Sequence, residues 1–414
     1  MRNIPASLQT TYANLLQAHL NLPHFDFDGA PFTIERRGKL YWYVNQRSVG
    51  AAAPKQRYLG PDTEEMRARI DAMREQKSDR ETMRESCSRM VAQLRAGGIP
   101  GLDRQTGTAL RSLVRSGVFR LGGTLVGTQA FRHYDMELGV VLSGGDGADR
   151  QLRETQDLDI AAFERLTNTI EDEADPDLAQ SLTDLGYKPV TRLERSKAST
   201  WRHANSAYDI DFLTPSFDAD QRLTHLDSLN VWAQGLHYLD FLIKNPMPAI
   251  SIYMEGLLVQ VPRPERYAIH KLIISQKRKA GSGVKARKDV QQARAIIWAM
   301  AEDRPYEIQN AVAEADAMGE KWRKALDRAL ELQIDPDNPT RPGDSAEFQG
   351  KALGGAPVRL RISGSALVQI AGEDKDTLLL AQKHRHTIEK MFRARFRTNP
   401  SSSILLTSHD LPTN

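Results

Sequence analysis

The sequence predicts an α/β (α+β) fold with a mixed β-sheet core flanked by helices. Two short segments, residues 156–160 and 208–213, alternate apolar and polar side chains with period two, as β-strands with one buried face do. Segments with helical spacing of apolar residues, above all residues 265–279 and 285–302, follow these strands. Around this core we expect an N-terminal β-hairpin and helical region and a small C-terminal α/β module.

The composition sets the outer limits of the prediction. A chain of 414 residues is long enough for two or three domains. Hydrophobic residues make up 40% and charged residues 26%, which is typical of a soluble globular protein. The net charge of +3 is too small to identify a nucleic-acid partner by itself. Cys87 is the only cysteine, which excludes an internal disulfide and a zinc site built from several cysteines.

The sequence also carries a prediction about location. It has no apolar window as long as a membrane-spanning helix, and its first residues lack the apolar stretch of a signal peptide. A single cysteine fits a reducing compartment. We therefore expect a cytoplasmic protein with no membrane partner.

Residues 1–116 are predicted as an N-terminal region of helix, β-hairpin and long helix. Residues 7–22 have leucines at helical spacing, and residues 32–44 alternate aromatic and polar side chains around an Arg-Arg-Gly-Lys turn. Residues 57–60 add a strand to this hairpin. A proline and acidic residues at 61–65 begin a long, charged helix that ends at the next glycines.

Residues 117–333 are predicted as the core and the helices that follow it. A buried strand over 119–126 ends at a Gly-Thr turn, and helical spacing returns at 129–137. A glycine-rich polar stretch at 143–155 predicts a surface loop. The remaining predicted elements are a helix over 161–171, strands over 157–160, 190–195, 200–204, 208–213 and 257–261, and helices over 265–279, 285–302 and 306–332.

The C-terminal part begins with proline and glycine punctuation. Three prolines and several glycines predict a linker over residues 334–356. Residues 357–400 are predicted as a small basic module, with a strand over 357–362 and a long helix over 377–396. Residues 401–414 are predicted to form a disordered tail.

Two pairs of acidic residues indicate the chemistry. Asp157 and Asp159, and likewise Asp209 and Asp211, are two residues apart on predicted strands, so each pair shares one face. Crowded carboxylates repel one another unless a divalent cation holds them, and Mg²⁺ prefers oxygen ligands and phosphates. Asp157 and Asp159, joined by one of the later pair, would hold two cations, and the third carboxylate would suit a general base. The alternative is a solvated strand face protected by charge.

The turn Gly127-Thr128 is the candidate phosphate-binding segment. A glycine at the end of a strand lets backbone approach a phosphate, and the following helix offers free N–H groups. Taken alone the signal is weak, because many turns between strands and helices contain glycine. It gains weight from its place before the acidic pair in the sequence.

An ordered string of motifs resembles a known family. The segments are GGTLVGT at 122–128, TQDLD at 155–159, FLTP at 212–215 and HKL at 270–272. They resemble a bacterial nucleotidyltransferase-fold family of the superfamily that includes DNA polymerase beta. The resemblance covers roughly residues 30–330. The interval between the Gly-Thr turn and the acidic pair is longer than in compact members, which weakens the alignment of the glycine motif most.

The resemblance implies roles for the acidic residues. Asp157 and Asp159 would bind metal, Mg²⁺ or Mn²⁺, and Asp211 would be the third ligand. Asp209 is its competitor, because it shares the same face. The resemblance also implies that the substrate would be a nucleoside triphosphate such as ATP. The core of the chain would then have a nucleotidyltransferase-like mixed sheet.

Cationic residues on the later helices would complete such a site. A triphosphate needs positive partners besides its metal. By resemblance, Lys271 is the candidate for a phosphate contact, and Lys288 on the next helix is a second one. Neighbouring cations such as Arg278 are more typical of a solvated helix face.

Two basic surfaces bear on the partner. The hairpin mixes cations with aromatics, a combination that suits RNA bases and phosphates, although an ordinary sheet with a solvated edge is the alternative. Its residues are Arg36, Arg37, Lys39, Tyr41, Trp42, Tyr43 and Arg47. The C-terminal helix would hold RNA, DNA or an acidic protein, or is simply a solvated face. Its basic residues are Lys383, His384, Arg385, His386, Lys390, Arg393, Arg395 and Arg397.

The sequence as a whole predicts a metal-dependent nucleotidyltransferase. It would move a nucleoside monophosphate from a nucleoside triphosphate to an acceptor and release pyrophosphate. The flanking basic regions favour RNA or a tRNA end as acceptor, while a protein hydroxyl or a small molecule stays open. The alternative class is a catalytically silent nucleotidyltransferase fold that binds nucleic acid or a partner protein.

Overall fold

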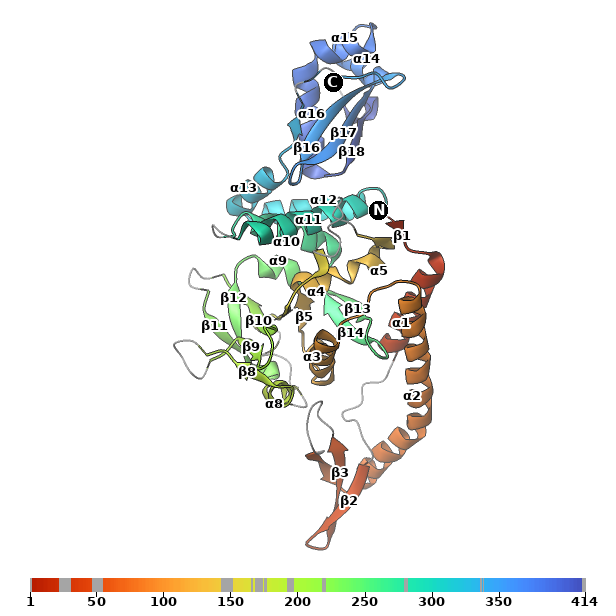
Figure 1. The fold of residues 1–414 in the computed structure, drawn as a ribbon, viewed down its shortest axis with the longest axis vertical. Coiled ribbons are helices and arrows are strands. Elements are labelled where there is room, and N and C mark those ends of the chain that lie inside the picture. The colour runs from red at the N-terminus through yellow and green to blue at the C-terminus, as the bar shows by residue number, and fades with distance from the viewer. Residues whose placement is uncertain are drawn as a thin grey trace. The chain divides into compact units, whose positions relative to one another are not determined.

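The computed structural model describes most of the chain (Figure 1). The described residues are 2–21, 31–46, 55–142, 152–164, 167, 174, 177–191, 197–217, 221–278, 282–335, 337 and 339–411. The chain divides into two compact units. The core unit comprises Asn3–Gly139 and Thr155–Pro262, and the terminal unit comprises Met1–Arg2, Val140–Glu154 and Arg263–Asn414. The domain boundaries predicted from the sequence stay predictions.

The core unit contains the central sheet. Its helices are α1 (Ala6–Leu20), α2 (Glu64–Ala96), α3 (Arg104–Arg115), α4 (Gly127–Phe131), α5 (Tyr134–Leu138), α8 (Leu178–Asp184), α9 (Leu239–Ile243) and the 3₁₀ turn η1 (Asp227–Leu229). Its strands are β2 (Pro31–Arg36), β3 (Lys39–Gln46), β4 (Lys55–Pro61), β5 (Thr124–Val126), β7 (Asp157–Ala161), β8 (Tyr187–Pro189), β9 (Thr200–His203), β10 (Asp209–Pro215), β11 (Leu223–Leu226), β12 (Val231–Leu236), β13 (Met247–Ser251) and β14 (Leu257–Val261). The two-residue strand β1 (Arg2–Asn3) precedes α1.

The central sheet is mixed, which confirms the predicted fold class. Its order is β11-β12-β10-β7-β5, and β9 pairs with both β8 and β10. Strand β10 runs parallel to β7 and to β12, whereas β5 is antiparallel to β7 and β9 is antiparallel to β10. On one edge of β10 the first half pairs with β9 and the second half with β12. Strand β10 is therefore paired along both edges, and the face of its side chains is well determined.

Alternating burial places the core on one side of the two central strands. Leu158 and Ile160 of β7 and Ile210 and Phe212 of β10 are at most 1% exposed, while the acidic residues between them are half-buried. Since side chains alternate along a strand, one face of the sheet packs into the core and the other carries the carboxylates. The sequence pattern predicted this arrangement.

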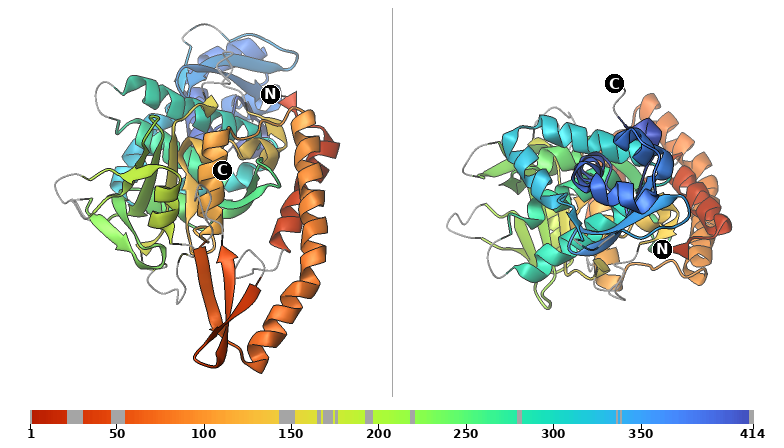
Figure 2. Two further views of the ribbon diagram at one scale, coloured as in Figure 1. Left: turned by 60° about the horizontal axis from the view of Figure 1, so that its bottom comes forward. Right: turned by 90° about the horizontal axis from the view of Figure 1, so that it is seen from above.

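The N-terminal part of the core unit is a three-stranded sheet beside a long helix. Strands β2-β3-β4 are antiparallel, and α2 begins three residues after β4 with Thr63 as its N-cap. Figure 2 shows this sheet next to the N-terminal end of α2. Trp42 and Val44 pack against Ile70 of α2. This confirms the predicted hairpin, the added strand and the long charged helix.

A polar contact reinforces the junction between this sheet and α2. The Asp62 carboxylate accepts hydrogen bonds from Arg67 of α2 and from the indole N–H of Trp42 on β3. The Arg67 bonds, helped by that of Trp42, lower the pKa of Asp62 to about 2. Asp62 therefore remains ionised and keeps both partners through the neutral pH range.

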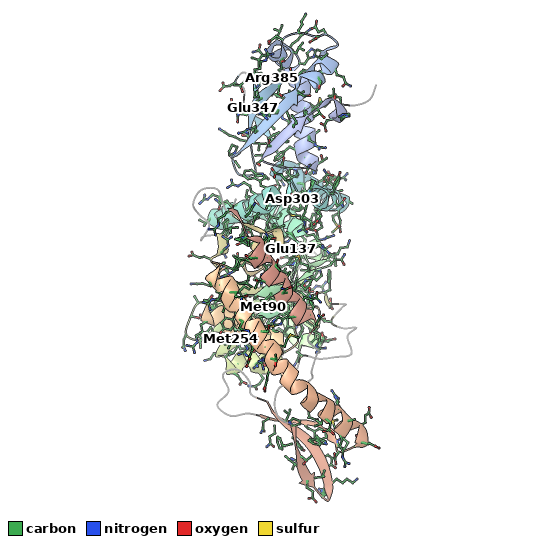
Figure 3. All side chains as sticks on the ribbon, turned by 90° about the vertical axis from the view of Figure 1, so that its right-hand side faces the viewer. Met90, Glu137, Met254, Asp303, Glu347 and Arg385 are labelled. Carbon is green, nitrogen blue, oxygen red and sulfur yellow. The ribbon has the colours of Figure 1, made fainter. Side chains whose placement is uncertain are left out.

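The terminal unit combines helices with a second sheet. Its helices are α10 (Pro264–Ser275), α11 (Gly283–Met300), α12 (Pro305–Ala317), α13 (Glu320–Ala329), α14 (Gly364–Ala371), α15 (Thr377–Lys383), α16 (Arg385–Thr398) and the 3₁₀ turn η2 (Ser408–Asp410). Its strands are β6 (Val140–Val141), β15 (Gln333–Ile334), β16 (Ser345–Ala352), β17 (Ala356–Ser363) and β18 (Ser403–Leu406). Strands β15-β16-β17-β18 form one sheet, and Figure 3 labels Glu347 on β16 and Arg385 on α16.

Several predicted elements are corrected by the structure. The strand expected over 119–126 begins only at Thr124, because Gly122 adopts a left-handed φ of 91° and Gly123 donates its backbone N–H to Val118 at 2.8 Å. The helix expected over 306–332 is divided by Gly319, which has a φ of 116°. The helix expected over 377–396 is likewise divided, at His384.

The two C-terminal connections predicted to lack structure each contain a strand. The range 334–356, predicted as a linker, contains β16, and the tail predicted after residue 400 contains β18. Both strands pair with β17, antiparallel and parallel respectively. The predicted loop at 143–155 lies mostly outside the described residues, as do most of the predicted helix over 161–171 and strand over 190–195.

The basic C-terminal helix is largely neutralised inside the terminal unit. Four of its cations form ion pairs with carboxylates. They are Lys383 with Glu373, Arg385 and Arg393 with Glu389, and Arg397 with Asp316 and Asp327. Because of these ion pairs, residues 377–398 offer less free positive charge than the sequence indicates.

Across the part of the chain that the structure covers, no helix has both the length and the apolar character needed to cross a membrane.

We expect the C-terminal sheet to depend on aromatic packing behind it. Phe392 of α16 is 0% exposed and meets Phe348 of β16 edge to face, with ring centroids 5.9 Å apart. Phe392→Ala should destabilise the fold by about 3–5 kcal/mol, through lost burial and a cavity. Leu379→Ala, at a helix residue that is 54% exposed, should cost less than about 0.5 kcal/mol. Urea unfolding followed by circular dichroism measures both, and equal costs would contradict this packing.

Candidate active site

Two neighbouring strands bring the predicted acidic residues together. In the parallel pair of β7 and β10, Asp157 lies opposite Asp209, and Asp159 lies opposite Asp211. Because residues in register on adjacent strands point to the same side, all four carboxylates share one face of the sheet. The sequence predicted each pair on one face, and the register of β7 and β10 unites the two pairs.

One of the four carboxylates already has a cationic partner. Arg202 of β9 lies opposite Asp209 and forms two hydrogen bonds to it, at 2.8 and 2.6 Å. The Asp209 side chain is 17% exposed and that of Arg202 is 58% exposed. This fork-to-fork pair compensates part of the charge of Asp209 and fixes its orientation. Asp209, the competitor for the third acidic position, is thus held in a cross-strand ion pair.

Asp211 has a different environment, with a hydroxyl partner. Thr200 of β9 lies opposite it and donates its hydroxyl to Oδ1 at 2.5 Å. Burial raises the pKa of Asp211, and the negative charges of Asp209 and Asp157 raise it further, against the lowering effect of the Thr200 bond. A carboxyl whose pKa is raised holds a proton more readily than an ordinary aspartate does, which is the property of a general base.

Gly127, the first residue of α4, allows the chain to pass close to β7, the strand that carries Asp157 and Asp159. It has a left-handed φ of 66°, which glycine adopts without strain. A methyl group added at Gly127 would overlap the carboxylate of Asp159. The preceding strand β5 pairs with β7, and Val126 of β5 lies opposite Asp159. Glycine is therefore required here for the close approach of the turn to the Asp159 carboxylate. Thr128 follows as the second residue of α4 and is partly buried.

The cations predicted on the later helices belong to the terminal unit, and Lys271 is held there by its own ion pair. Its ammonium donates to Asp289 of α11 at 2.7 Å, and Arg278 bonds the other oxygen of this carboxylate. The Lys271 and Asp289 side chains are 8% and 4% exposed. Lys288 is more exposed and donates to the backbone carbonyl of Glu154. The phosphate-binding roles of Lys271 and Lys288 stay predictions.

His270, next to Lys271, is buried and neutral. Burial, together with the charge of Lys271, lowers the pKa of His270 to about 3. Its Nδ1 atom has no hydrogen-bond partner among the described residues. Packing inside the helices is thus the role that the structure supports for this histidine.

The acidic face has the donors that a divalent cation prefers, but not a preformed centre. Asp157, Asp159 and Asp211 supply hard oxygen atoms, and burial, together with the negative charges of Asp209 and Asp157, raises the pKa of Asp211. Within the described ranges, no group of three or more acidic, histidine or cysteine side chains is arranged to hold a metal ion. The residue types of this face fit Mg²⁺.

Sequence reasoning missed Thr200 and the role of Arg202 as a partner of the acidic strand. Both lie on β9, opposite Asp211 and Asp209. Thr200 and Arg202 share a face with the carboxylates. This could have been predicted only if the register between β9 and β10 had been known. The sequence placed two successive strands over 200–204 and 208–213 but left their pairing undetermined.

The comparison with known families agrees with this geometry. Residues 104–317 match a family described as nucleotidyltransferase, which is more than half of the chain. Neither the curated proteins nor the solved structures compared with the chain gave a match. A mixed sheet with carboxylates on neighbouring strands is the arrangement expected of that class. The chain belongs to this nucleotidyltransferase family, and the family supports nucleotidyl transfer as its general activity.

Gly127 should be intolerant of even one methyl group. In Gly127→Ala the alanine must adopt a left-handed backbone conformation, which costs free energy, and its Cβ must displace the Asp159 carboxylate. The matched control is Gly372→Ala, since Gly372 has a φ of 68° with no atom within 4 Å of an added Cβ. We expect about 1 kcal/mol of destabilisation in the control and about 1–3 kcal/mol more at Gly127. Denaturant unfolding distinguishes them, and indistinguishable losses would show that the carboxylate moves aside freely.

The Lys271 ion pair should contribute to stability far more than Lys288 does. Lys271→Met leaves Asp289 buried with Arg278 as its remaining cationic partner, and removing one member of a buried pair costs about 3 kcal/mol. Lys288→Met removes a hydrogen bond to a backbone carbonyl at the surface and should cost less than about 1 kcal/mol. Thermal or urea unfolding of both variants tests this difference. If Lys271→Met were as stable as wild type, the ammonium would not be needed for folding.

Proposed function

We propose that this protein is a metal-dependent nucleotidyltransferase. It transfers a nucleoside monophosphate from a nucleoside triphosphate to a hydroxyl of an acceptor, with RNA or a tRNA end as the preferred acceptor. The observation that carries the proposal is the register of β7 and β10, which places Asp211 directly beside Asp159. Family membership supports the general reaction, and the donor chemistry of this face supports the metal.

In this proposal, Asp157, Asp159 and Asp211 hold Mg²⁺ or Mn²⁺. A bound divalent cation supplies positive charge to the phosphate oxygens of the transition state. Asp157 and Asp159 contribute from one strand, so their separation is set by the pleat of β7. Gly127 allows the start of α4 to lie against Asp159, and we assign nucleotide phosphates to Gly127 and Thr128.

Asp211 is the residue proposed to receive the acceptor proton. Thr200 occupies its Oδ1 atom, which leaves Oδ2 to accept a proton from the acceptor hydroxyl. The acceptor oxygen then forms a bond to the α-phosphorus, the bond from that phosphorus to the bridging oxygen breaks, and pyrophosphate leaves with the electron pair. We assign Thr200 as a positioning residue, because its hydroxyl orients the Asp211 carboxylate.

A binding module without turnover is the second candidate. The observation that favours it is the lack of a preformed metal-holding group among the described residues. Such a protein would use the same fold to bind nucleic acid or a partner protein. The two candidates differ in whether pyrophosphate is released, so one assay separates them.

Pyrophosphate release should require the β7 carboxylates. The protein is incubated with each nucleoside triphosphate and total RNA, with Mg²⁺, with Mn²⁺ or with chelator. Asp159→Asn and Asp157→Asn should each reduce release by about 100-fold or more, because a charge that stabilises the transition state is lost. Chelator should abolish it.

Asp209→Asn is the matched control on the same face. Asp209 is engaged in an ion pair with the half-exposed Arg202 and is not among the proposed metal ligands, so this variant should keep its rate within about tenfold of wild type. Radiolabel from the α-phosphate identifies the acceptor that is modified. A protein that releases no pyrophosphate with any nucleotide, acceptor or metal would support the binding module instead.

A further inference from the structure

The N-terminal three-stranded sheet has two faces of different character. One face packs on α2 through Trp42, Val44 and Ile70. The opposite face carries a row of aromatic side chains. In the antiparallel register, Phe32 of β2 lies opposite Tyr43 of β3, and Tyr43 lies opposite Tyr58 of β4. All three strands therefore contribute to one aromatic surface.

The rings of this surface form a continuous cluster. We call it the aromatic face, and its members are Phe32, Tyr41, Tyr43 and Tyr58. Ring centroids are 6.3 Å apart between Phe32 and Tyr43, 5.4 Å between Tyr43 and Tyr58, and 6.0 Å between Tyr41 and Tyr58. Tyr43 is the buried centre, at 8% exposure, while Tyr58 is 50% exposed. Tyr58 thus presents its ring to solvent, and Phe32 and Tyr41 are partly exposed around the buried Tyr43.

Cations accompany the aromatic face. The guanidinium of Arg36 lies over the ring of Tyr43, 5.4 Å from its centroid. Arg37 in the adjoining turn and Lys39 at the start of β3 are exposed, and the described residues supply no carboxylate that forms an ion pair with them. In the described strands of this sheet the one acidic residue is Glu35, which lies opposite Leu40 and alternates away from the aromatic row. Positive charge is therefore concentrated beside the exposed rings.

We propose that the aromatic face binds a single strand of RNA. Half-exposed tyrosine rings offer flat surfaces on which unpaired bases stack, and the cations beside them neutralise phosphates. A double helix keeps its bases stacked inside, so it cannot use the rings in this way. The structure favours a strand of RNA over a protein partner, because the face combines π-surfaces with positive charge, and Glu35, the acidic residue in the described strands of this sheet, belongs to the opposite face.

The proposal deepens the proposed function and rests on it for the choice of RNA over DNA. Binding is measured without nucleotide and without metal, so it does not depend on turnover. The probe is a fluorescein-labelled single-stranded oligoribonucleotide of mixed sequence, about twelve nucleotides long, titrated with the full chain and followed by anisotropy. The same sequence as a duplex is a second probe.

The variants separate stacking from charge and from folding. Tyr58→Ala should weaken binding of the single strand about tenfold, the effect of losing one stacked base, while Tyr58→Phe should restore it. Leu40→Ala removes an exposed side chain, 44% exposed, from the opposite face and should leave the affinity unchanged. Arg36→Gln should lower the slope of log affinity against log salt concentration by about 0.7.

The outcomes are distinguishable from those of the catalytic test. Equal affinity of wild type and Tyr58→Ala, or duplex binding as tight as that of the single strand, would overturn the aromatic face as a stacking surface. Loss of binding in both Tyr58→Ala and Tyr58→Phe would also refute stacking. If Tyr58→Ala binds weakly while Asp159→Asn still releases pyrophosphate at the wild-type rate, the RNA surface stands and the proposed catalytic site does not.

Discussion

The mutual repulsion of carboxylates on adjacent parallel strands is the constraint on which this site depends. Register alone brings four acidic residues onto one face of β7 and β10. Two neighbours on β9 relieve part of this charge, Arg202 by an ion pair with Asp209 and Thr200 by a hydrogen bond to Asp211. What remains is an anionic patch in which the pKa of Asp211 is raised. Such a patch is costly unless a cation binds to it, which connects the stability of the sheet to its proposed chemistry.

The glycine turn serves the same electrostatic arrangement. A phosphate-binding role was predicted from the conformational freedom of Gly127 at the end of a strand. The structure shows this freedom used for close approach to a carboxylate, since any Cβ at this position would overlap Asp159. Gly127 thus determines how near the start of α4 can come to the acidic strand.

The sequence predicted what depends on periodicity and missed what depends on register. Period-two alternation identified β7 and β10 and the face of their aspartates. The Thr200 contact requires the exact pairing of β9 with β10, and a one-residue shift would exchange the two faces of β9. The Lys271 pair joins two helices, and Asp289 is eighteen residues away, so helical spacing cannot reveal it. Strand β16 was hidden because neighbouring prolines and glycines indicated a linker, although its residues alternate in burial.

The distribution of paired charge explains why two basic segments lead to different conclusions. The C-terminal helix is the richer in cations, yet Lys383, Arg385, Arg393 and Arg397 form ion pairs within their own unit. A nucleic acid would have to displace those carboxylates before it could contact the guanidinium groups. On the N-terminal sheet, Arg36 lies over a tyrosine ring, where its charge is still available to a phosphate. A count of basic residues in the sequence treats the two segments alike. Nucleic-acid recognition depends instead on the positive charge that the fold leaves uncompensated and on the aromatic surface beside it.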